Sequence, residues 1–578
     1  MTLDGLTLHC TVEELKTKIE NAKVQKVLMP ARDEIVLQLY SAAEGTLRLC
    51  VSADAGDCAV YLTANAKKNP KTPPLFCMFL RKHLTGAVIT HIEQSGLNRV
   101  VTITFSARDE LMRQIELKMI VEIMGKYSNV ILTDSNGKIL DSIRRVSADV
   151  SSMRVILPAM PYHDPPQQKL NPVALSQVSL IEALSTKQDV RVTTQITSVL
   201  DGISTQTALE ILHRAGVETD AAASLAEKQV RHIAATMQEF LTDAIEHPQP
   251  CVQLNQDGLP VFFSCVPYQT YPEQARTAFD TCNEMLDYYY ARRAELFRLQ
   301  QQKDSLAKSI GKQLARVEKR IRIYQASMDD VARAGKFQKR ADYITANLYR
   351  LKKGMKSFET ADYETGEPVS IQLDVSMTPQ EQAQKLYKKI AKYKRAAAMN
   401  ETKLAQALDE QDFLLGALHY TENADNGKDI ADIRSSLAKA GYLASPPKGK
   451  KEAEAKNESQ PMHFVSQTGY EIFVGKNDRQ NDILTMRMAG KDDIWFHAQK
   501  IPGSHVLLVT DGKALDDIDD DTVVYAATLA AKYSRARQSG KTPVDYTQRK
   551  NVKKPPNSRP GKVIYDDYFT VYVDASTD

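Results

Sequence analysis

The chain has 578 residues, 43% of them hydrophobic, so it is too long for one core and we expect about three to five folded domains. Its formal net charge is only +3, which excludes a uniformly basic protein and makes any basic surface a local feature. The seven cysteines have no metal-ligand spacing, and neither a signal-peptide pattern nor a membrane-length apolar run occurs. We therefore expect a reduced, cytoplasmic protein without metal, cofactor or membrane partner.

The first segment, residues 1–175, predicts a mixed α/β domain. A capped amphipathic pattern runs from Thr11 to Ala22 with Thr11 as N-cap, and the residues before it, among them Asp4, look strand-like. Short apolar runs bounded by polar turns predict strands on both sides of a helix over residues 73–84, whose first turn contains proline.

One of these strands begins just after Asn98 and Arg99. An arginine at the start of a strand is ordinarily exposed to solvent, but it can also stack on a nucleotide or hydrogen-bond to it. In the second case Asp4 would orient the guanidinium or accept a hydrogen bond from a base.

Residues 176–275 have a helical pattern. The stretch from Gln195 to Gly216 predicts two short helices joined by Gly202-Ile203-Ser204, an arrangement that resembles a helix-hairpin-helix. Backbone amides at such a glycine turn can bind phosphate, although an ordinary helical turn has the same pattern and is favoured by the sequence alone.

Residues 276–443 predict an antiparallel coiled-coil arm, because two apolar seams recur with spacings of three and four. The seams are Leu306, Ile310, Leu314, Val317, Ile321, Tyr324 and Met328, and then Ala383, Leu386, Ile390, Tyr393, Ala397, Asn400, Leu404 and Ala407. Asn400 would fix the register, and the insert at residues 341–354 is expected at or near the tip.

The outer faces of this arm are rich in lysine and arginine, with too few acids to balance them, so they are either a solvated surface or a contact for RNA. These cations are Arg292, Arg293, Arg298, Lys312, Arg316, Lys319, Arg320, Arg322, Lys385, Lys388, Lys389, Lys392, Lys394 and Arg395.

Residues 444–460 are polar and charged and predict a flexible linker. Residues 461–578 predict an α/β domain with strands in YEIFVG, ILTMRM, DIWFHA, SHVLLV, KVIY and FTVYV. A helix is expected from Asp521 to Arg537, capped by Asp521 or Thr522.

The segment from Lys532 to Lys562 contains ten basic residues and one acid, Asp545, which suits a phosphate backbone. We expect RNA contacts from Lys532, Arg535, Arg537, Arg549, Lys550, Lys553 and Lys554. His505 either contacts RNA or locks its loop by hydrogen bonds, whereas His497 and Trp495 look like parts of a packed strand. No nucleophile, P-loop or Rossmann motif occurs, so we expect no enzyme.

Several blocks carry a resemblance that spans nearly the whole chain. MTLDGL, EIMGKYSNVILTD, MRVILPAMPYHDPP, DIWFHAQKIPGSHVLL and VDYTQRKNVKKPPNSRPGKVIY resemble the NFACT family in the family's order. The resemblance implies a multidomain α+β fold. Its parts would be a glycosylase-like NFACT-N domain, a helix-hairpin-helix region, the coiled-coil arm and an NFACT-R RNA-binding domain.

The resemblance also implies a function. Such a protein binds a large ribosomal subunit that still holds peptidyl-tRNA, through its rRNA, and recruits tRNA, in bacteria alanyl-tRNA. It supports untemplated C-terminal tailing that marks the stalled chain for degradation, while the ribosome makes the peptide bonds. The family's Asp-Arg pair that faces the anticodon falls on Asn98 and Arg99, and its N-terminal acid falls on Asp4. Asn98 keeps the shape of aspartate but exchanges one acceptor oxygen for a donor group.

Two other functions are suggested, one by the family's fold and one by its older name. Fold analogy suggests a nucleic-acid enzyme of glycosylase or lyase type, although Thr2 stands where those enzymes have a proline nucleophile. The older family name suggests a surface adhesin that binds fibronectin.

Overall fold

The computed structural model describes residues 3–149, 151, 154–166, 169–185, 190–217, 226–256, 258–444, 459–537, 540–556 and 558–575. Thr2 and nearly all of the expected linker at 444–460 lie outside these residues. The chain divides into two compact units, Met1–Leu296 and Phe297–Asp578. The multidomain α+β class is confirmed, since helices and antiparallel sheets occur in both units.

The first unit is built on a nine-stranded antiparallel sheet with the order β4-β3-β2-β1-β5-β6-β7-β8-β9. Two meanders join where Lys23 of β1 pairs with Val88 of β5. The strands are β1 Lys23–Ala31, β2 Glu34–Ser41, β3 Gly45–Ser52, β4 Ala59–Leu62, β5 Val88–Gln94, β6 Val100–Arg108, β7 Gln114–Glu122, β8 Asn129–Asp134 and β9 Ile139–Ser142. The expected helix over 73–84 is α2, Leu75–Leu84.

The first helix, α1, spans Gly5–Ile19 and not Thr11 to Ala22. Its N-cap is Asp4, whose carboxylate accepts a hydrogen bond from the backbone N–H of Thr7, so the strand-like interpretation of Asp4 was wrong. Thr11 instead lies inside the helix and donates its hydroxyl to the carbonyl of Thr7.

Helix α1 lies between two hydrophobic cores, which explains why its sequence pattern predicted the wrong starting residue. Leu8 and Leu15 pack into the core of the nine-stranded sheet. Leu6 and Cys10 pack into a second core formed with the helical segment that follows. A helix buried on two sides is apolar nearly all round, and a one-sided amphipathic pattern does not locate its start.

Among its described residues, that helical segment contains four helices and a small sheet. The helices are α3 Gln177–Leu184, α4 Val192–Val199, α5 Thr205–Arg214 and α6 Glu227–Glu246. The strands are β10 Cys251–Leu254, β11 Pro260–Ser264 and β12 Arg276–Ala278, in the order β11-β10-β12.

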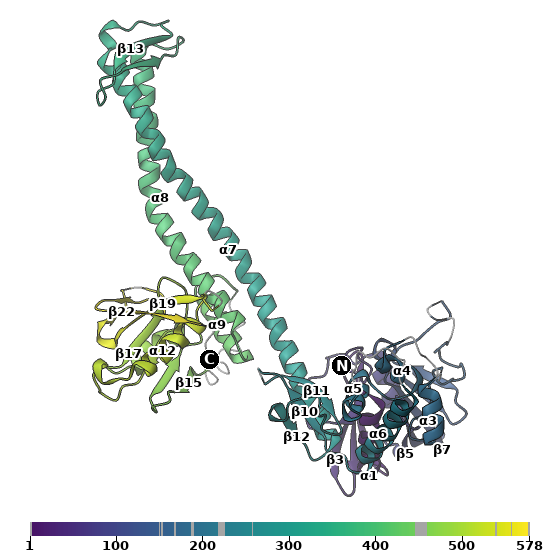
Figure 1. Ribbon diagram of the computed structural model, residues 1–578. Coiled ribbons are helices and arrows are strands. Elements are labelled where there is room, and N and C mark those ends of the chain that lie inside the picture. Colours follow the sequence, from purple (N-terminus) through teal and green to yellow (C-terminus); the bar gives the residue numbers. More distant parts are fainter. Residues whose placement is uncertain are drawn as a thin grey trace. The chain divides into compact units, whose positions relative to one another are not determined.

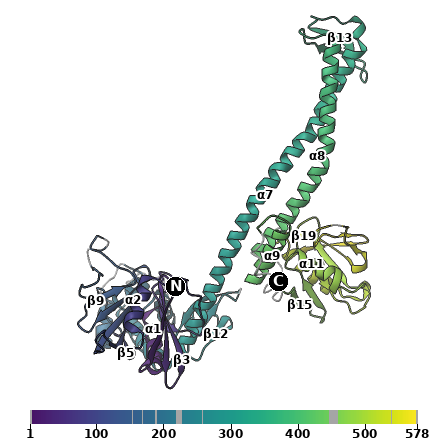
Figure 2. The ribbon, with the colours of Figure 1, turned by 180° about the vertical axis from the view of Figure 1, so that it is seen from behind.

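The second unit contains two long helices that run side by side (Figures 1 and 2). They are α7, Cys282–Ala346, which begins in the first unit, and α8, Pro379–Glu422. We call the part of this pair from residue 297 onward the arm. Near its base Leu306, Ile310 and Leu314 of α7 share a core with Leu414 of α8.

Nearer the tip of the arm, Tyr343 shares a core with Ala383, so the two helices are antiparallel. Asn400 donates a hydrogen bond of 2.9 Å to the Ser327 hydroxyl across this pair. The hairpin of β13, Ser357–Ala361, and β14, Pro368–Gln372, lies at the far end (Figure 1).

The C-terminal segment of this unit forms a six-stranded sheet with the order β15-β16-β18-β17-β19-β22. The strands are β15 Met462–Val465, β16 Glu471–Val474, β17 Ile494–Ala498, β18 Val506–Leu508, β19 Lys541–Gln548 and β22 Phe569–Asp574. Helix α12, Asp520–Lys532, shares the core of this sheet, and β20, Val552–Lys553, pairs with β21, Ile564–Tyr565.

Two expectations for this segment were wrong. The ILTMRM stretch is not a strand: it lies in α11, Asp478–Ile483, and the π-helical turn η4, Leu484–Met488. Asn477 accepts a hydrogen bond from the N–H of Gln480 and so starts a helix that the apolar pattern did not reveal. The cap of α12 is Asp519, which accepts from the N–H of Thr522.

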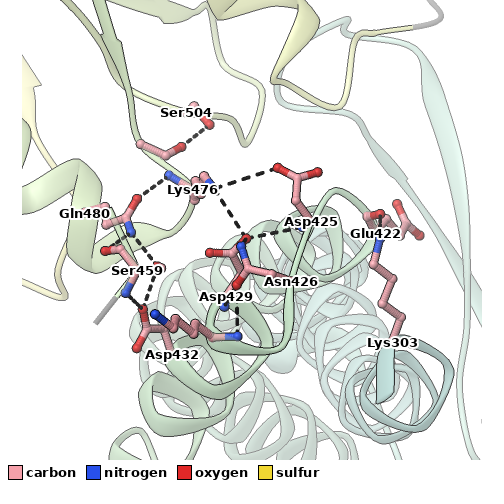
Figure 3. Close-up of polar contacts among 12 residues, drawn as sticks. Lys303, Glu422, Asp425, Asn426, Asp429, Asp432, Ser459, Lys476, Gln480 and Ser504 are labelled. Atoms are coloured by element: carbon pink, nitrogen blue, oxygen red, sulfur yellow. Dashed lines mark hydrogen bonds and ion pairs between the residues drawn. The ribbon is translucent and has the colours of Figure 1, made fainter. Parts of the chain in front are cut away.

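Polar contacts tie the base of the arm to the C-terminal segment (Figure 3). Helix α9, Gly427–Lys439, presents Asp429, whose carboxylate lies 3.5 Å from the Lys476 ammonium. The Asp429 side chain is only 1% exposed, and its carboxylate also accepts hydrogen bonds from the N–H of Asp425 and the Asn426 amide. Among the described residues, no helix is both long enough and apolar enough to cross a membrane.

Candidate nucleic-acid interface

A cavity of about 220 Å³ in the first unit is lined by two of the three residues expected to contact tRNA, Asp4 and Arg99. Lys169 and the turn at Gly202 and Ser204 complete much of its wall. Groups from four separate stretches of the sequence therefore meet at one place.

Asp4 is held by both of its carboxylate oxygens. One accepts from the N–H of Thr7 at 2.9 Å, and the other accepts from the hydroxyl of Thr207 on α5 at 2.8 Å. The carboxylate thus joins the start of α1 to the first turn of α5 while it still borders the cavity.

Close backbone approach brings these segments together. The N–H of Gly5 donates to the carbonyl of Gly202 at 2.9 Å. A Cβ on Gly5 would lie 1.9 Å from the carbonyl oxygen of Leu97, and Gly202 has a φ of +72°. Both positions therefore require glycine.

The neighbouring residues Asn98 and Arg99 have different surroundings. Arg99 is half-buried and lines the cavity. Asn98 is 9% exposed, and its carbonyl accepts a hydrogen bond of 2.6 Å from the Gln94 side chain. Contact of Asn98 with tRNA stays a prediction, and its side chain is far less accessible than that of Arg99.

Sequence reasoning missed Lys169. In the sequence it lies between strand β9 and helix α3. It is exposed, and no periodic pattern of apolar residues marks it. The glycine turn was recognised, and Ser204 in it caps α5 by accepting from the N–H of Thr207 at 3.1 Å. Only the fold places the lysine beside that turn.

His505 lies inside the C-terminal segment. The residue is 2% exposed and its Nδ1 is 2.7 Å from the hydroxyl oxygen of Thr485. Burial and the neighbouring His497 lower its pKa well below the usual value, so the ring is neutral. Trp495 is 1% exposed, which confirms that it belongs to the core, and His497 stacks on it with ring centroids 5.7 Å apart.

Carboxylates neutralise part of the expected basic surface. Lys554 pairs with Asp482 at 2.7 Å and Lys553 with Asp566 at 3.7 Å. Arg549 turns inward, since its guanidinium donates to the carbonyls of Thr485 and Val552.

The rest of that surface is more open. Arg535, Arg537 and Lys550 are exposed, and no carboxylate of the described residues lies within ion-pair distance of them. Lys532 is half-buried at the end of α12. Fewer basic residues are therefore left without a carboxylate partner than the sequence indicated. RNA binding by these residues stays a prediction.

The arm displays many of its cations to solvent. Lys312, Arg316, Lys319, Arg322, Lys385, Lys388, Lys392, Lys394 and Arg395 are all exposed. Arg320 is an exception because it pairs with Glu410 across the two helices, and Lys389 lies over the ring of Phe337 at 4.1 Å. Within the described residues, no group of three His, Cys, Asp or Glu side chains is arranged to hold a metal ion.

Comparison with known proteins gives matches over the whole chain. The family model "NFACT N-terminal and middle domains" matches residues 4–457, and "NFACT protein RNA binding domain" matches residues 460–567. The chain is 33% identical over 584 residues to the "Rqc2 homolog RqcH" of Bacillus subtilis (strain 168), with 100% of this chain and 99% of the relative covered.

Two further similarities come from Streptococcus suis. The "Rqc2 homolog RqcH" of strain 05ZYH33 is 32% identical over 587 residues, with 100% of this chain and 99% of the relative covered. The solved N-terminal part of its fibronectin/fibrinogen-binding protein is 31% identical, covers 50% of this chain and 99% of that chain, and has a TM-score of 0.42.

Proposed function

The chain belongs to the NFACT family, and we propose how it acts as a ribosome quality-control factor. It binds large ribosomal subunits that are obstructed by peptidyl-tRNA and recruits tRNA, in particular alanyl-tRNA. The stalled chain is then extended without a template and marked for degradation. This happens in the cytoplasm, and the ribosome makes the peptide bonds, so the protein's own work is binding and positioning.

The observation that carries this proposal is the meeting of Asp4, Arg99 and Lys169 around one cavity beside the Gly202 turn. A guanidinium can stack on or donate to a base, while a lysine and the N-terminus of α5 attract phosphate. A carboxylate held in place by Thr7 and Thr207 accepts from base amino groups without having to reorganise. The site therefore has separate partners for the base and the backbone of a tRNA loop.

The other parts of the chain would supply affinity. The exposed cations of the arm and those near the end of α12 give a sequence-independent attraction to rRNA.

In this proposal the NFACT-N domain covers residues 1–175 with a glycosylase-like fold, and a helix-hairpin-helix region covers 176–275. The antiparallel coiled-coil region, which includes the arm, covers 276–443, a linker covers 444–460, and the NFACT-R domain covers 461–578.

The test is cosedimentation of the purified protein with large subunits that carry peptidyl-tRNA, over a series of salt concentrations. We expect binding to obstructed large subunits, little binding to intact ribosomes, and an affinity that falls linearly in a log–log plot against salt. Equal binding to intact ribosomes, or none to obstructed subunits, would contradict the proposal.

A further inference from the structure

A second cavity, of about 450 Å³, lies within the second unit between α8 and the C-terminal segment. Asp412 and Phe413 of α8 form one wall. The opposite walls come from the Pro502-Gly503 and Pro560-Gly561 turns. Its volume is in the range of sites that bind small molecules or single nucleotides.

Buried hydrogen bonds hold the walls of this cavity in place. The Tyr420 hydroxyl of α8 donates to the carbonyl of Gly503 at 2.8 Å, and the Asn481 amide donates to the same hydroxyl at 3.0 Å. The Asn481 side-chain oxygen accepts from the N–H of His505 at 3.1 Å. The walls of the cavity are therefore fixed by hydrogen bonds among residues of the chain itself.

The interior offers flat groups and one unsatisfied donor. The Arg559 guanidinium lies over the Phe413 ring at 4.7 Å. Its Nη1 is buried, and no described residue accepts a hydrogen bond from it. Asp409 lies 3.9 Å from the Nε of Arg559 and also pairs with Lys562, so it does not accept a hydrogen bond from Nη1. A buried donor without an acceptor is costly, and a ligand that brought an acceptor oxygen or nitrogen would remove that cost.

The imidazole of His497 lines the same cavity. Burial lowers the pKa of His497 to about 4, so the ring is neutral at neutral pH, although hydrogen bonds to the backbone of Gly503 and Ala498 act in the opposite direction. Asp412 adds a carboxylate that can accept from an exocyclic amino group. A nucleobase stacks its face on flat groups and forms hydrogen bonds with donors and acceptors along its edge, and this cavity has both kinds of group.

Lys500 lines the cavity as an exposed residue, and its backbone is strained. Its φ is +56°, a region that glycine adopts readily and lysine does not. The Lys500 ammonium therefore borders the cavity from a strained turn position. A phosphate of the ligand is the natural partner for it.

We propose that this cavity binds one unpaired RNA nucleotide, with its base among Phe413, His497 and Arg559 and its phosphate at Lys500. The C-terminal segment would then recognise a base that is turned out of its stack, in addition to contacting the RNA backbone. This inference deepens the proposed function and depends on it only for the identity of the RNA as ribosomal or transfer RNA.

Trp495 makes the proposal directly measurable. It is the only tryptophan of the chain and stacks on His497, so its fluorescence reports on the cavity. The full-length protein is titrated with the four nucleoside 5′-monophosphates, ribose 5-phosphate and inorganic phosphate, with equilibrium dialysis as a second readout. We expect saturable binding of at least one nucleotide, about tenfold tighter than ribose 5-phosphate. Equal binding of ribose 5-phosphate, or no nucleotide binding by either readout, overturns the proposal.

A matched pair of variants separates binding from folding. Lys500→Gly removes the charge and relieves the backbone, so its melting temperature should be equal or higher while nucleotide affinity falls about tenfold. Asp511→Gly is the control, because Asp511 is also exposed, has a φ of +52° and lies outside the described lining of the cavity. We expect unchanged nucleotide binding for this control. Unchanged binding in Lys500→Gly contradicts the phosphate contact.

Cosedimentation with obstructed large subunits distinguishes this inference from the proposed function. Subunit binding without any nucleotide binding would leave the function intact and refute the nucleotide site. Nucleotide binding without subunit binding would support the site and refute the function.

Discussion

At the scale of single residues, the same side chains that build the fold also border its cavities. Asp4 caps α1 and accepts from Thr207, yet it lines the first cavity. Arg99 differs, because no hydrogen bond of its side chain occurs among the described residues. A change at Arg99 therefore tests function with little effect on the fold, whereas a change at Asp4 affects both.

We predict that Arg99→Ala lowers the enrichment of tRNA on large subunits about tenfold, since alanine has no charged group to bind the nucleotide. The measurement is sequencing of the tRNAs that copurify with the protein on large subunits. Arg108→Ala, an exposed arginine at the end of β6, is the control and should leave the enrichment unchanged. Unaltered tRNA enrichment in Arg99→Ala would rule out its role at the anticodon.

A second prediction concerns acid. The pKa of His497 is lowered from 6.5 to about 4 by burial, so between these values the unfolded chain binds more protons than the folded one. The stability from this ring is complete above pH 6.5 and decreases as pH falls, by on the order of 1 kcal/mol per pH unit. Asp478 acts in the opposite direction, because burial raises its pKa to about 7 and its protonation favours the folded state.

The variant His497→Gln isolates this contribution. Thermal unfolding followed by Trp495 fluorescence at pH 7 and pH 5 should show a smaller decrease of melting temperature for the variant than for the wild type. Its absolute stability is not informative, since the ring also packs on Trp495. Parallel decreases in the two proteins would show that His497 does not titrate as described.

At the scale of elements, helix α7 begins with an unusual cap. The carboxylate of Glu14, on α1, accepts from the N–H of Cys282 at 2.6 Å and from that of Asn283 at 3.0 Å. It also accepts from the Asn283 amide at 2.7 Å. A negative charge at the positive end of a 65-residue helix thus fixes α7 to the sheet-bearing domain of the first unit.

We predict that Glu14→Gln destabilises the first unit by about 1–2 kcal/mol, because the amide replaces an acceptor oxygen and removes the charge. Hydrogen exchange at the amides of residues 282 and 283 should be faster, and the melting temperature lower. Glu13→Gln is a matched control, since Glu13 forms an exposed ion pair with Lys16, and its loss should change stability by less than about 0.5 kcal/mol. Equal effects of the two variants would contradict the capping role.

At the scale of the whole molecule, a net charge of +3 conceals a strongly uneven distribution. Exposed cations line the arm, whereas several of the basic residues in the C-terminal segment are paired with carboxylates. The position of the charge, and not its sum, is therefore expected to govern RNA binding.

This distribution yields a prediction about salt. Replacing Lys388, Lys392 and Lys394 of the arm by glutamine should lower the log–log salt slope of large-subunit binding by about one unit for each phosphate that the variant no longer neutralises. Replacing the exposed Lys26, Lys68 and Lys71 of the first unit changes the net charge equally and should leave the slope nearly unchanged. A slope that responds equally to both sets would show that only total charge matters.

The sequence by itself determined the features that depend on neighbours in the chain. The seams around Leu306 and Ala407 predicted the paired helices, because a repeat of three and four residues is a local property of one helix. Glycine turns such as Gly202, with its positive φ, were recognised for the same reason.

Only the tertiary structure decided what depends on residues far apart in the chain. Asp4 meets Thr207 across 203 positions, and the charge of Lys554 is balanced by Asp482, 72 positions away. Likewise, no periodicity links Phe413 to Arg559 or Lys169 to Arg99. Charge compensation, capping across segments and the walls of both cavities are set by packing, which brings distant side chains together and which local patterns do not record.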